Sequence, residues 1–160
     1  MNKTKRIIFT SLFSALCCVL TMIIKIPSPI GGFMNLGDAA VLASGWFLGG
    51  WYGFFAAAIG SALADVFSGY VVYAPATFII KGLMALILYA FSKGEKKQGL
   101  IIGAALSEIV MCAGYYIFDG FLYGFGASLL NIPANLFQGA FGFFAGLLLI
   151  NIFKKSKISL

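Results

Sequence analysis

Polar side chains interrupt the apolar tracts of this chain at helical spacing, and they are the residues that could do chemistry. Asn131, Asn135 and Gln138 stand at i, i+4 and i+7, and Thr77 and Lys81 are four residues apart. Such spacing places each set on one face of a helix. A third set has the same spacing: Glu108, Cys112, Tyr115 and Asp119. We expect three helices to turn these polar faces toward one shared cavity.

The chemistry open to these residues is hydrogen bonding and charge pairing. Lys81 and Glu108 either form an ion pair that locks the helices together or contact a ligand directly, and the sequence leaves both open. Asn135 and Gln138 are predicted ligand contacts, because an uncharged amide offers a donor and an acceptor to the edge of a heterocycle. Neither amide is expected to partner a charge.

The remaining candidates are aromatic or acidic. Tyr73 and Tyr115 are candidates for stacking on a flat ligand ring. Asp38 is either a further site residue or a cap of its own helix, where a carboxylate at the N-terminus is expected anyway. Asp65 and Asp119 are either part of the polar site, Asp119 through its place in the stripe of Glu108, or only solvated residues of the membrane interface. The chain has no histidine and its 3 cysteines lack metal-ligand spacing, so we predict no catalytic residue, metal or cofactor.

The elements that must position these groups are membrane-spanning helices. The chain of 160 residues is 61% hydrophobic and only 10% charged, which is typical of an integral membrane protein rather than a soluble domain. Apolar runs of about 20 residues, broken by Gly and Pro, predict an all-α domain of six transmembrane helices. The expected ranges are 7–24, 36–49, 51–68, 75–91, 99–118 and 132–153, with external links at 25–32, 68–74 and 119–131.

Basic residues gather at the ends of the apolar tracts. Because Lys and Arg are retained on the cytoplasmic side, an even number of crossings must separate one cluster from the next, which predicts that both termini are cytoplasmic. The net charge of +6 is thereby explained without a nucleic-acid partner. The clusters are Lys3, Lys5 and Arg6; Lys93, Lys96 and Lys97; and Lys154, Lys155 and Lys157.

Depth along the helices separates polar from apolar halves. At about 1.5 Å per residue, Lys81 lies roughly 9 Å below the outer surface, Gln138 lies at a similar depth, and Glu108 is near the midplane. The inner half carries almost no polar group besides small hydroxyls. This asymmetry favours a cup that opens outward over a pore or an alternating-access path, since both of those need polar lining on the inner side as well.

Several short segments form a series along the chain. They are Asn35-Leu36-Gly37-Asp38-Ala39; Ala64-Asp65 with Ser68-Gly69-Tyr70; Ala74-Pro75-Ala76-Thr77 with Lys81-Gly82; Glu108 with Gly114-Tyr115; and Pro133 with Asn135 and Gln138. In this order and over nearly the whole chain, they resemble the substrate-binding S components of energy-coupling factor (ECF) vitamin transporters. The resemblance adds Asn35 to the candidate substrate contacts.

The resemblance implies a subunit of a prokaryotic plasma membrane that captures a vitamin or precursor from outside. It implies partners, namely a transmembrane coupling subunit with two cytoplasmic ATPases, and toppling in the membrane to release the cargo. This fits the lack of a GxxxxGK[ST] phosphate loop in the sequence. Family members often dock through AxxxA on the first helix, where this chain has Ser11 with Ala15 and Ser14 with Cys18.

The substrate is expected to be a small aromatic heterocycle such as hydroxymethylpyrimidine or a pyridoxine-like B6 vitamer, with riboflavin next. The site offers amides, phenols and a near-neutral Lys81/Glu108 couple in place of the basic cluster that a phosphate needs. Two other classes stay open. One is a proton-coupled secondary transporter that uses Glu108; the other, ranked last, is an intramembrane enzyme, because no paired nucleophile and base occur.

Overall fold

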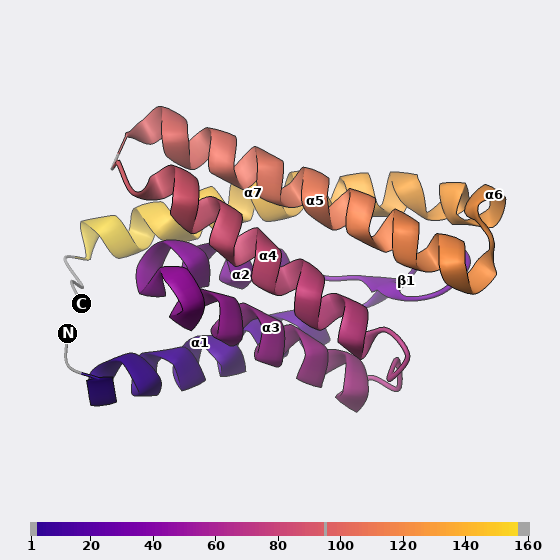
Figure 1. Ribbon diagram of the computed structural model, residues 1–160, viewed down its shortest axis with the longest axis horizontal. Helices are drawn as coiled ribbons and strands as arrows, with labels where there is room; N and C mark the ends of the chain where they lie inside the picture. The colour runs from indigo at the N-terminus through magenta and orange to yellow at the C-terminus, as the bar shows by residue number, and fades with distance from the viewer. Residues whose placement is uncertain (1–2, 95, 157–160) are drawn as a thin grey trace.

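The computed structural model describes residues 3–94 and 96–156, which form a bundle of helices with one small hairpin (Figure 1). Lys157, expected in the last basic cluster, lies outside the described residues. The elements are α1 (Lys3–Ile23), β1 (Ile26–Pro27), β2 (Phe33–Met34), α2 (Gly37–Leu48), α3 (Gly50–Phe67), α4 (Ala74–Ser92), α5 (Lys97–Tyr123), α6 (Phe125–Ser128), the 3-10 turn η1 (Leu129–Asn131) and α7 (Ile132–Lys155).

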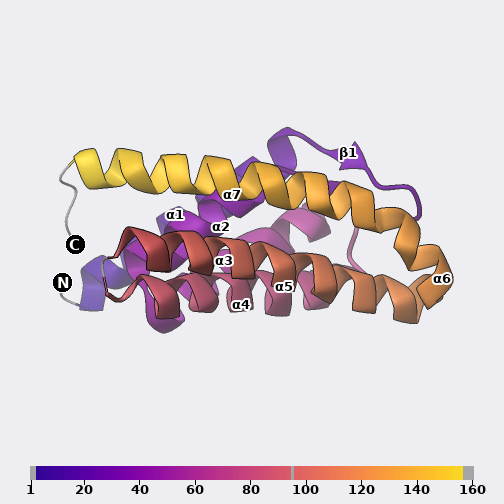
Figure 2. The same ribbon diagram turned by 90° about the horizontal axis from the view of Figure 1, so that it is seen from above.

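The long helices run roughly along one axis, so the bundle has two distinct ends (Figures 1 and 2). The start of α1, the end of α7 and the connection between α4 and α5 lie at one end, here called the basic end. The hairpin, α6 and the connection between α3 and α4 lie toward the other, here called the hairpin end. The predicted clustering of basic residues at one end therefore holds for Lys3 to Arg6, for Lys93, Lys96 and Lys97, and for Lys154 and Lys155.

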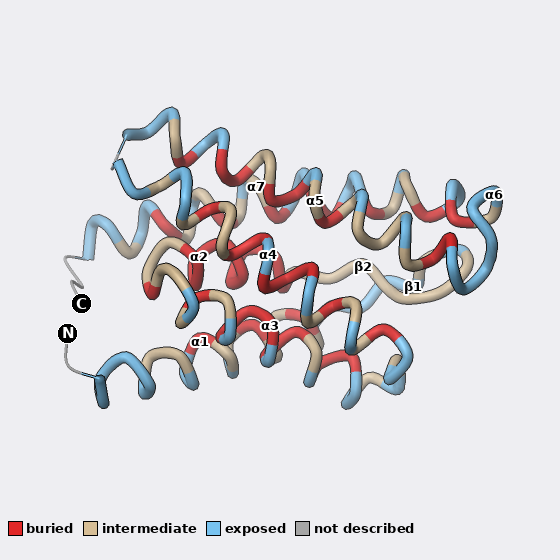
Figure 3. Tube along the Cα trace, in the orientation of Figure 1, coloured by how far each residue is buried: buried red, intermediate tan, exposed pale blue. Residues whose placement is uncertain are grey.

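Five helices of the described chain are long and apolar enough to cross a membrane. They are α1, α3, α4, α5 and the stretch from α6 through α7. The expected span 36–49 is instead the 12-residue helix α2, which at about 1.5 Å per residue is roughly 18 Å long and shorter than a bilayer core of about 30 Å. Its residues from Gly37 to Gly45 are all buried, in the middle of the bundle (Figure 3).

Helix α5 continues beyond its predicted end. The sequence placed its end at Phe118 and an external link from Asp119, but the helix extends to Tyr123. Gly120 lies inside the helix and serves packing, since its missing side chain makes room for the ring of Phe125. The helix ends instead at Gly124, which has a φ of 90°. The external link from Asp119 is therefore wrong, and so is the alternative of a solvated interface residue: Asp119 is 1% exposed, within the last turns of α5.

The predicted external link 25–32 contributes to a hairpin. Strands β1 and β2 pair antiparallel, with Ile26 opposite Met34 and Pro27 opposite Phe33. Gly32 has a φ of 72° in the turn, a conformation that side chains with a Cβ rarely adopt. The hairpin is anchored to the helices by side chains, since Asn131 at the start of α7 bonds to the backbone of Ile30 and Gly31.

Glycines let helix backbones meet where packing holds a membrane bundle together. A Cβ on Gly45 of α2 would collide with the carbonyl oxygen of Ala85 in α4 and lie 2.9 Å from its Cα. We expect Gly45→Ala to lower the free energy of unfolding by about 1–3 kcal/mol, because backbone atoms cannot yield to the added methyl group. SDS-induced unfolding followed by circular dichroism measures the loss. Gly126→Ala is the matched control, since nothing lies within 4 Å of its Cβ position; equal losses in the two variants would contradict the close approach.

Candidate functional site

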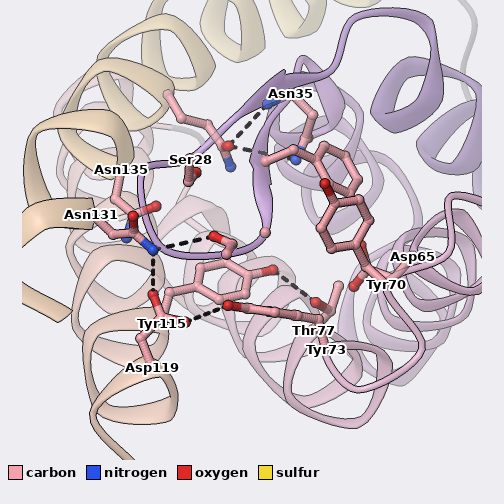
Figure 4. A pocket seen from close by; sticks show the side chains of 14 residues that line it. Ser28, Asn35, Asp65, Tyr70, Tyr73, Thr77, Tyr115, Asp119, Asn131 and Asn135 are labelled. Atoms are coloured by element: carbon pink, nitrogen blue, oxygen red, sulfur yellow. Dashed lines mark hydrogen bonds between the residues drawn. The ribbon is translucent and has the colours of Figure 1, made fainter. Parts of the chain in front are cut away.

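A small cavity lies at the hairpin end, where the hairpin meets the ends of four helices (Figure 4). Its volume is about 30 Å³, which is room for about two water molecules. The hairpin contributes backbone and an aromatic ring, and the helices contribute hydroxyls, amides and carboxylates. The lining consists of Ser28, Gly31, Gly32, Phe33, Asn35, Asp65, Tyr70, Tyr73, Thr77, Tyr115, Asp119, Asn131, Asn135 and Gln138.

Asp119 organises one wall of this cavity. Its Oδ1 accepts a hydrogen bond of 2.8 Å from the hydroxyl of Tyr73, and its Oδ2 accepts one of 2.8 Å from Nδ2 of Asn131. The Asn131 amide also donates to the carbonyl of Gly31 at 3.2 Å. Burial, above all, and the bond to Asp119 raise the pKa of the Tyr73 hydroxyl, so it stays protonated as the donor. One carboxylate thus ties the start of α4, the end of α5 and the start of α7 to the hairpin.

The cavity floor rests on a buried ion pair. Lys81 Nζ pairs with Asp38 Oδ1, and the two side chains are 2% and 0% exposed. Gln138 links this pair to the cavity: its Nε2 donates to Asp38 Oδ2 at 2.7 Å, and its Oε1 accepts from the backbone of Asn35 at 3.0 Å. Lys81 also lies 5.5 Å from the ring centroid of Tyr115. The charged layer is therefore separated from the cavity by one amide and one ring.

This geometry corrects three expectations. The partner of Lys81 is Asp38 and not Glu108. Asp38 is not a helix cap, because α2 has no side-chain cap and the carboxylate points at Lys81 and Gln138. Gln138 does partner a charge, so its amide has a structural role that the sequence did not indicate. The physical reason is depth: α2 is short and central, which brings Asp38 level with Lys81.

Two polar groups on the lining are left free for a ligand. Asn135 is 9% exposed, and within the described part of the chain its amide forms no hydrogen bond. Asp65 is 6% exposed, and its Oδ2 is buried without a hydrogen-bond partner. Asp65 is thus not a solvated interface residue, which was one of the two roles that the sequence left open. A neutral amide and an unsatisfied carboxylate oxygen would together accept donors of a bound heterocycle.

Aromatic side chains form much of the remaining wall. The Tyr115 hydroxyl is 2.9 Å from the Thr77 hydroxyl, which joins α5 to α4. Phe33 of the hairpin packs on Tyr70 with ring centroids 4.9 Å apart, and Tyr70 packs edge-on against Tyr73 at 6.3 Å. These rings give the cavity flat faces on which an aromatic ligand could stack.

Glu108 lies apart from the cavity. It faces α7, where Gly139 and Gly142 leave room for its carboxylate, and a Cβ on Gly142 would be 2.6 Å from its Oε1. Both carboxylate oxygens are buried without a hydrogen-bond partner. A separate, mainly apolar crevice of about 520 Å³ between α5 and α7 has Glu108 as one of its lining residues. Neither predicted role, pairing with Lys81 or lining the polar cavity, is seen.

We expect Glu108→Leu to keep or increase the stability of the bundle. A buried acceptor without a partner costs about 1–3 kcal/mol, and the change removes two of them. An ion pair with Lys81 would predict the opposite, a large loss. Thermal unfolding of the purified variant in detergent decides between the two. Ile109→Leu, one residue along α5 and exposed, serves as the control for substitution in this helix.

Five of the eight predicted substrate contacts line the cavity and three do not. Asp38 and Lys81 form the layer beneath it, and Glu108 lies elsewhere. Other lining residues were not among the predicted substrate contacts, although their places in the polar stripes or in the compared segments already indicated them. The five are Asn35, Tyr73, Tyr115, Asn135 and Gln138, and the others include Asp65, Tyr70, Thr77, Asp119 and Asn131.

The two candidate docking pairs of α1 differ in exposure. Ser11 and Ala15 are exposed, next to Leu12, which is 60% exposed. Ser14 and Cys18 are half-buried, and a Cβ on Gly60 of α3 would collide with the carbonyl oxygen of Ser14. Ser14 is therefore used in packing α1 on α3, which leaves the Ser11/Ala15 pair as the accessible one.

The chain is similar in sequence and in structure to known proteins. A family model described as the ECF-type riboflavin transporter, S component, matches residues 1–155. The chain belongs to this family. The S component is similar in structure to a solved S component of a bacterial ECF transporter, with a TM-score of 0.75, 27% sequence identity and 96% of each chain covered. It is also 37% identical to an uncharacterised protein of Pyrococcus woesei over 130 residues, and this matched region covers 80% of this chain and 87% of the relative.

Family membership confirms the resemblance drawn from the sequence. This S component is a transmembrane transporter subunit and not an enzyme, as its family and its structural neighbour indicate. Its long apolar helices fit a multi-pass membrane protein.

Proposed function

We propose that the cavity at the hairpin end captures a flat heterocyclic vitamin from outside the cell for uptake. The observation that carries the proposal is the lining itself: aromatic faces, one unpaired amide and one unsatisfied carboxylate oxygen in a chain of the S component family. Riboflavin ranks first, because the matching family is described by it. Hydroxymethylpyrimidine and pyridoxine, which the sequence favoured, are smaller aromatic rings and rank next.

Binding requires the cavity to expand. Ligand sites typically have volumes of roughly 300–1,000 Å³, against about 30 Å³ here. The hairpin is the element best suited to move, since Asn131 holds it by two bonds of 3.2 and 3.3 Å, long for hydrogen bonds. We propose that vitamin entry displaces the hairpin and replaces these contacts.

The basic end is assigned to the cytoplasm by the positive-inside rule. The hairpin end then faces outward in the cell membrane, where the vitamin arrives. Release on the inner side would be driven by the family's partners, a coupling subunit and two ATPases, with the exposed Ser11/Ala15 face of α1 as the docking surface. The proton-coupled alternative is not favoured, because Glu108 does not line the polar cavity.

Titrating the purified chain in detergent with riboflavin and following the vitamin's own fluorescence tests the assignment directly. We expect saturable quenching and a raised melting temperature, with weaker shifts for hydroxymethylpyrimidine and pyridoxine. A panel in which no vitamin changes the melting temperature would contradict vitamin capture. Uptake by the chain reconstituted alone, without ATPases, would favour the proton-coupled alternative.

Asn135→Ala is expected to raise the Kd of the vitamin about tenfold, the effect of losing one or two ligand hydrogen bonds. Stability should change little, because the Asn135 amide forms no hydrogen bond within the described residues. The same titration measures the Kd. Asn151→Ala, an exposed amide near the opposite end of α7, is the matched control, and equal Kd values for both variants would exclude Asn135 from the site.

A further inference from the structure

A second cavity lies at the basic end, away from the vitamin site. Its volume is about 310 Å³, and its lining comes from four helices: Trp46 of α2, Ser92 of α4, Leu100 of α5 and Lys154 of α7, with Lys96 immediately before α5. Two ammonium groups, one hydroxyl and two apolar side chains therefore surround one hollow. The proposed function makes no use of it.

The charges around this hollow are unbalanced. Within the residues that the structure describes, no carboxylate forms an ion pair with Lys96 or Lys154; Glu95 lies outside the described residues. Both lysines are exposed, and Lys154 Nζ lies 5.4 Å from the ring centroid of Trp46. An anion in this space would accept charge-assisted hydrogen bonds from both ammonium groups.

The apolar side of the hollow adds a second requirement. Leu100 is only 5% exposed and Trp46 is half-buried, so apolar side chains line the hollow next to the ammonium groups. Trp and Lys side by side at the end of membrane helices mark the level of the lipid headgroups. Basic pockets between helices at this level suit anionic headgroups, whose phosphate meets the lysines while the acyl chains follow the apolar wall.

We propose that this hollow binds the phosphate of an anionic phospholipid, such as phosphatidylglycerol, in the leaflet at the basic end. Lys96 and Lys154 contact the phosphate oxygens, Ser92 lies at their side, and Trp46 with Leu100 supports the glycerol and the start of the acyl chains. One lipid molecule would bridge the end of α7 to the connection between α4 and α5.

Trp46 provides the reporter. The full-length chain with Trp51→Phe, which removes the second of its 2 tryptophans, is reconstituted in phosphatidylcholine vesicles that contain a minority of phosphatidylglycerol brominated near the headgroup. We expect stronger quenching of Trp46 than with phosphatidylcholine brominated at the same carbons. Lys96→Gln with Lys154→Gln should weaken the apparent affinity for the brominated phosphatidylglycerol about fivefold for each lysine.

The matched control removes the same charge from the same end. Lys93→Gln with Lys155→Gln leaves the lining intact and should keep the quenching, while circular dichroism confirms that both double variants fold. Equal weakening in the two pairs would overturn the site in favour of general attraction between the basic end and the bilayer. Equal quenching by the two brominated lipids would also overturn it. Relief of quenching by added inorganic phosphate would assign the hollow to a free anion instead of a lipid.

Discussion

Lys81→Met is expected to lower the free energy of unfolding by about 3–5 kcal/mol, the typical result of removing one partner from a buried ion pair. Lys81 and Asp38 are both almost wholly buried, so the variant leaves a carboxylate inside the bundle with only the amide of Gln138 to donate to it. SDS-induced unfolding, followed by circular dichroism, measures the change. Lys155→Met at the exposed end of α7 is the control for loss of a lysine and should leave the free energy of unfolding nearly unchanged.

A double variant separates the ion pair from the packing around it. Replacing Asp38 by leucine in the Lys81→Met background removes both charges, and apolar side chains of similar volume often restore the stability of a buried pair or exceed it. We therefore expect the double variant to be more stable than Lys81→Met alone. If the loss of stability in the double variant equals the sum of the losses in Lys81→Met and in Asp38→Leu, the pair is not energetically coupled, and the proposed charged layer beneath the cavity is wrong.

Asp119→Ala is expected to raise the Kd of the vitamin at least about a hundredfold, provided that the cavity is the vitamin site. The change deletes two charge-assisted hydrogen bonds, from Tyr73 and from Asn131, each of which contributes about 1.5–3 kcal/mol when an ionised group takes part. Without them the start of α4, the end of α5 and the start of α7 lose the bonds that hold their lining side chains in place, whether or not the hairpin has moved. Fluorescence titration with riboflavin measures the effect.

A graded series makes this second prediction sharper. Tyr73→Phe removes one of the two donors and should cost about tenfold in affinity, and Asp119→Asn, which retains one acceptor, should fall between that variant and the alanine variant. Phe121→Ala, an exposed change in the same turn of α5, is the control. Affinities within threefold of the native chain across the series would show that the Asp119 network does not shape the site.

The sequence by itself determined the class of protein, the approximate helices and the grouping of polar residues. Apolar runs and basic clusters are local properties, and they are set by the solvent that each stretch must meet, lipid or water. The stripe of Asn131, Asn135 and Gln138 followed from helical spacing alone, and all three residues line the cavity. The series of short segments was also sufficient to indicate the family, which the family model confirms.

Only the tertiary structure decided which charges meet. Helical spacing states which face a residue occupies but not how far one helix is shifted along another, and a shift of one turn, about 5.4 Å, exchanges one partner for the next. The short, central α2 brings Asp38 to Lys81 and leaves Glu108 against the glycines of α7. The extension of α5 past Gly120 was hidden for the same reason, because what Gly120 accommodates is the ring of Phe125, a contact between segments.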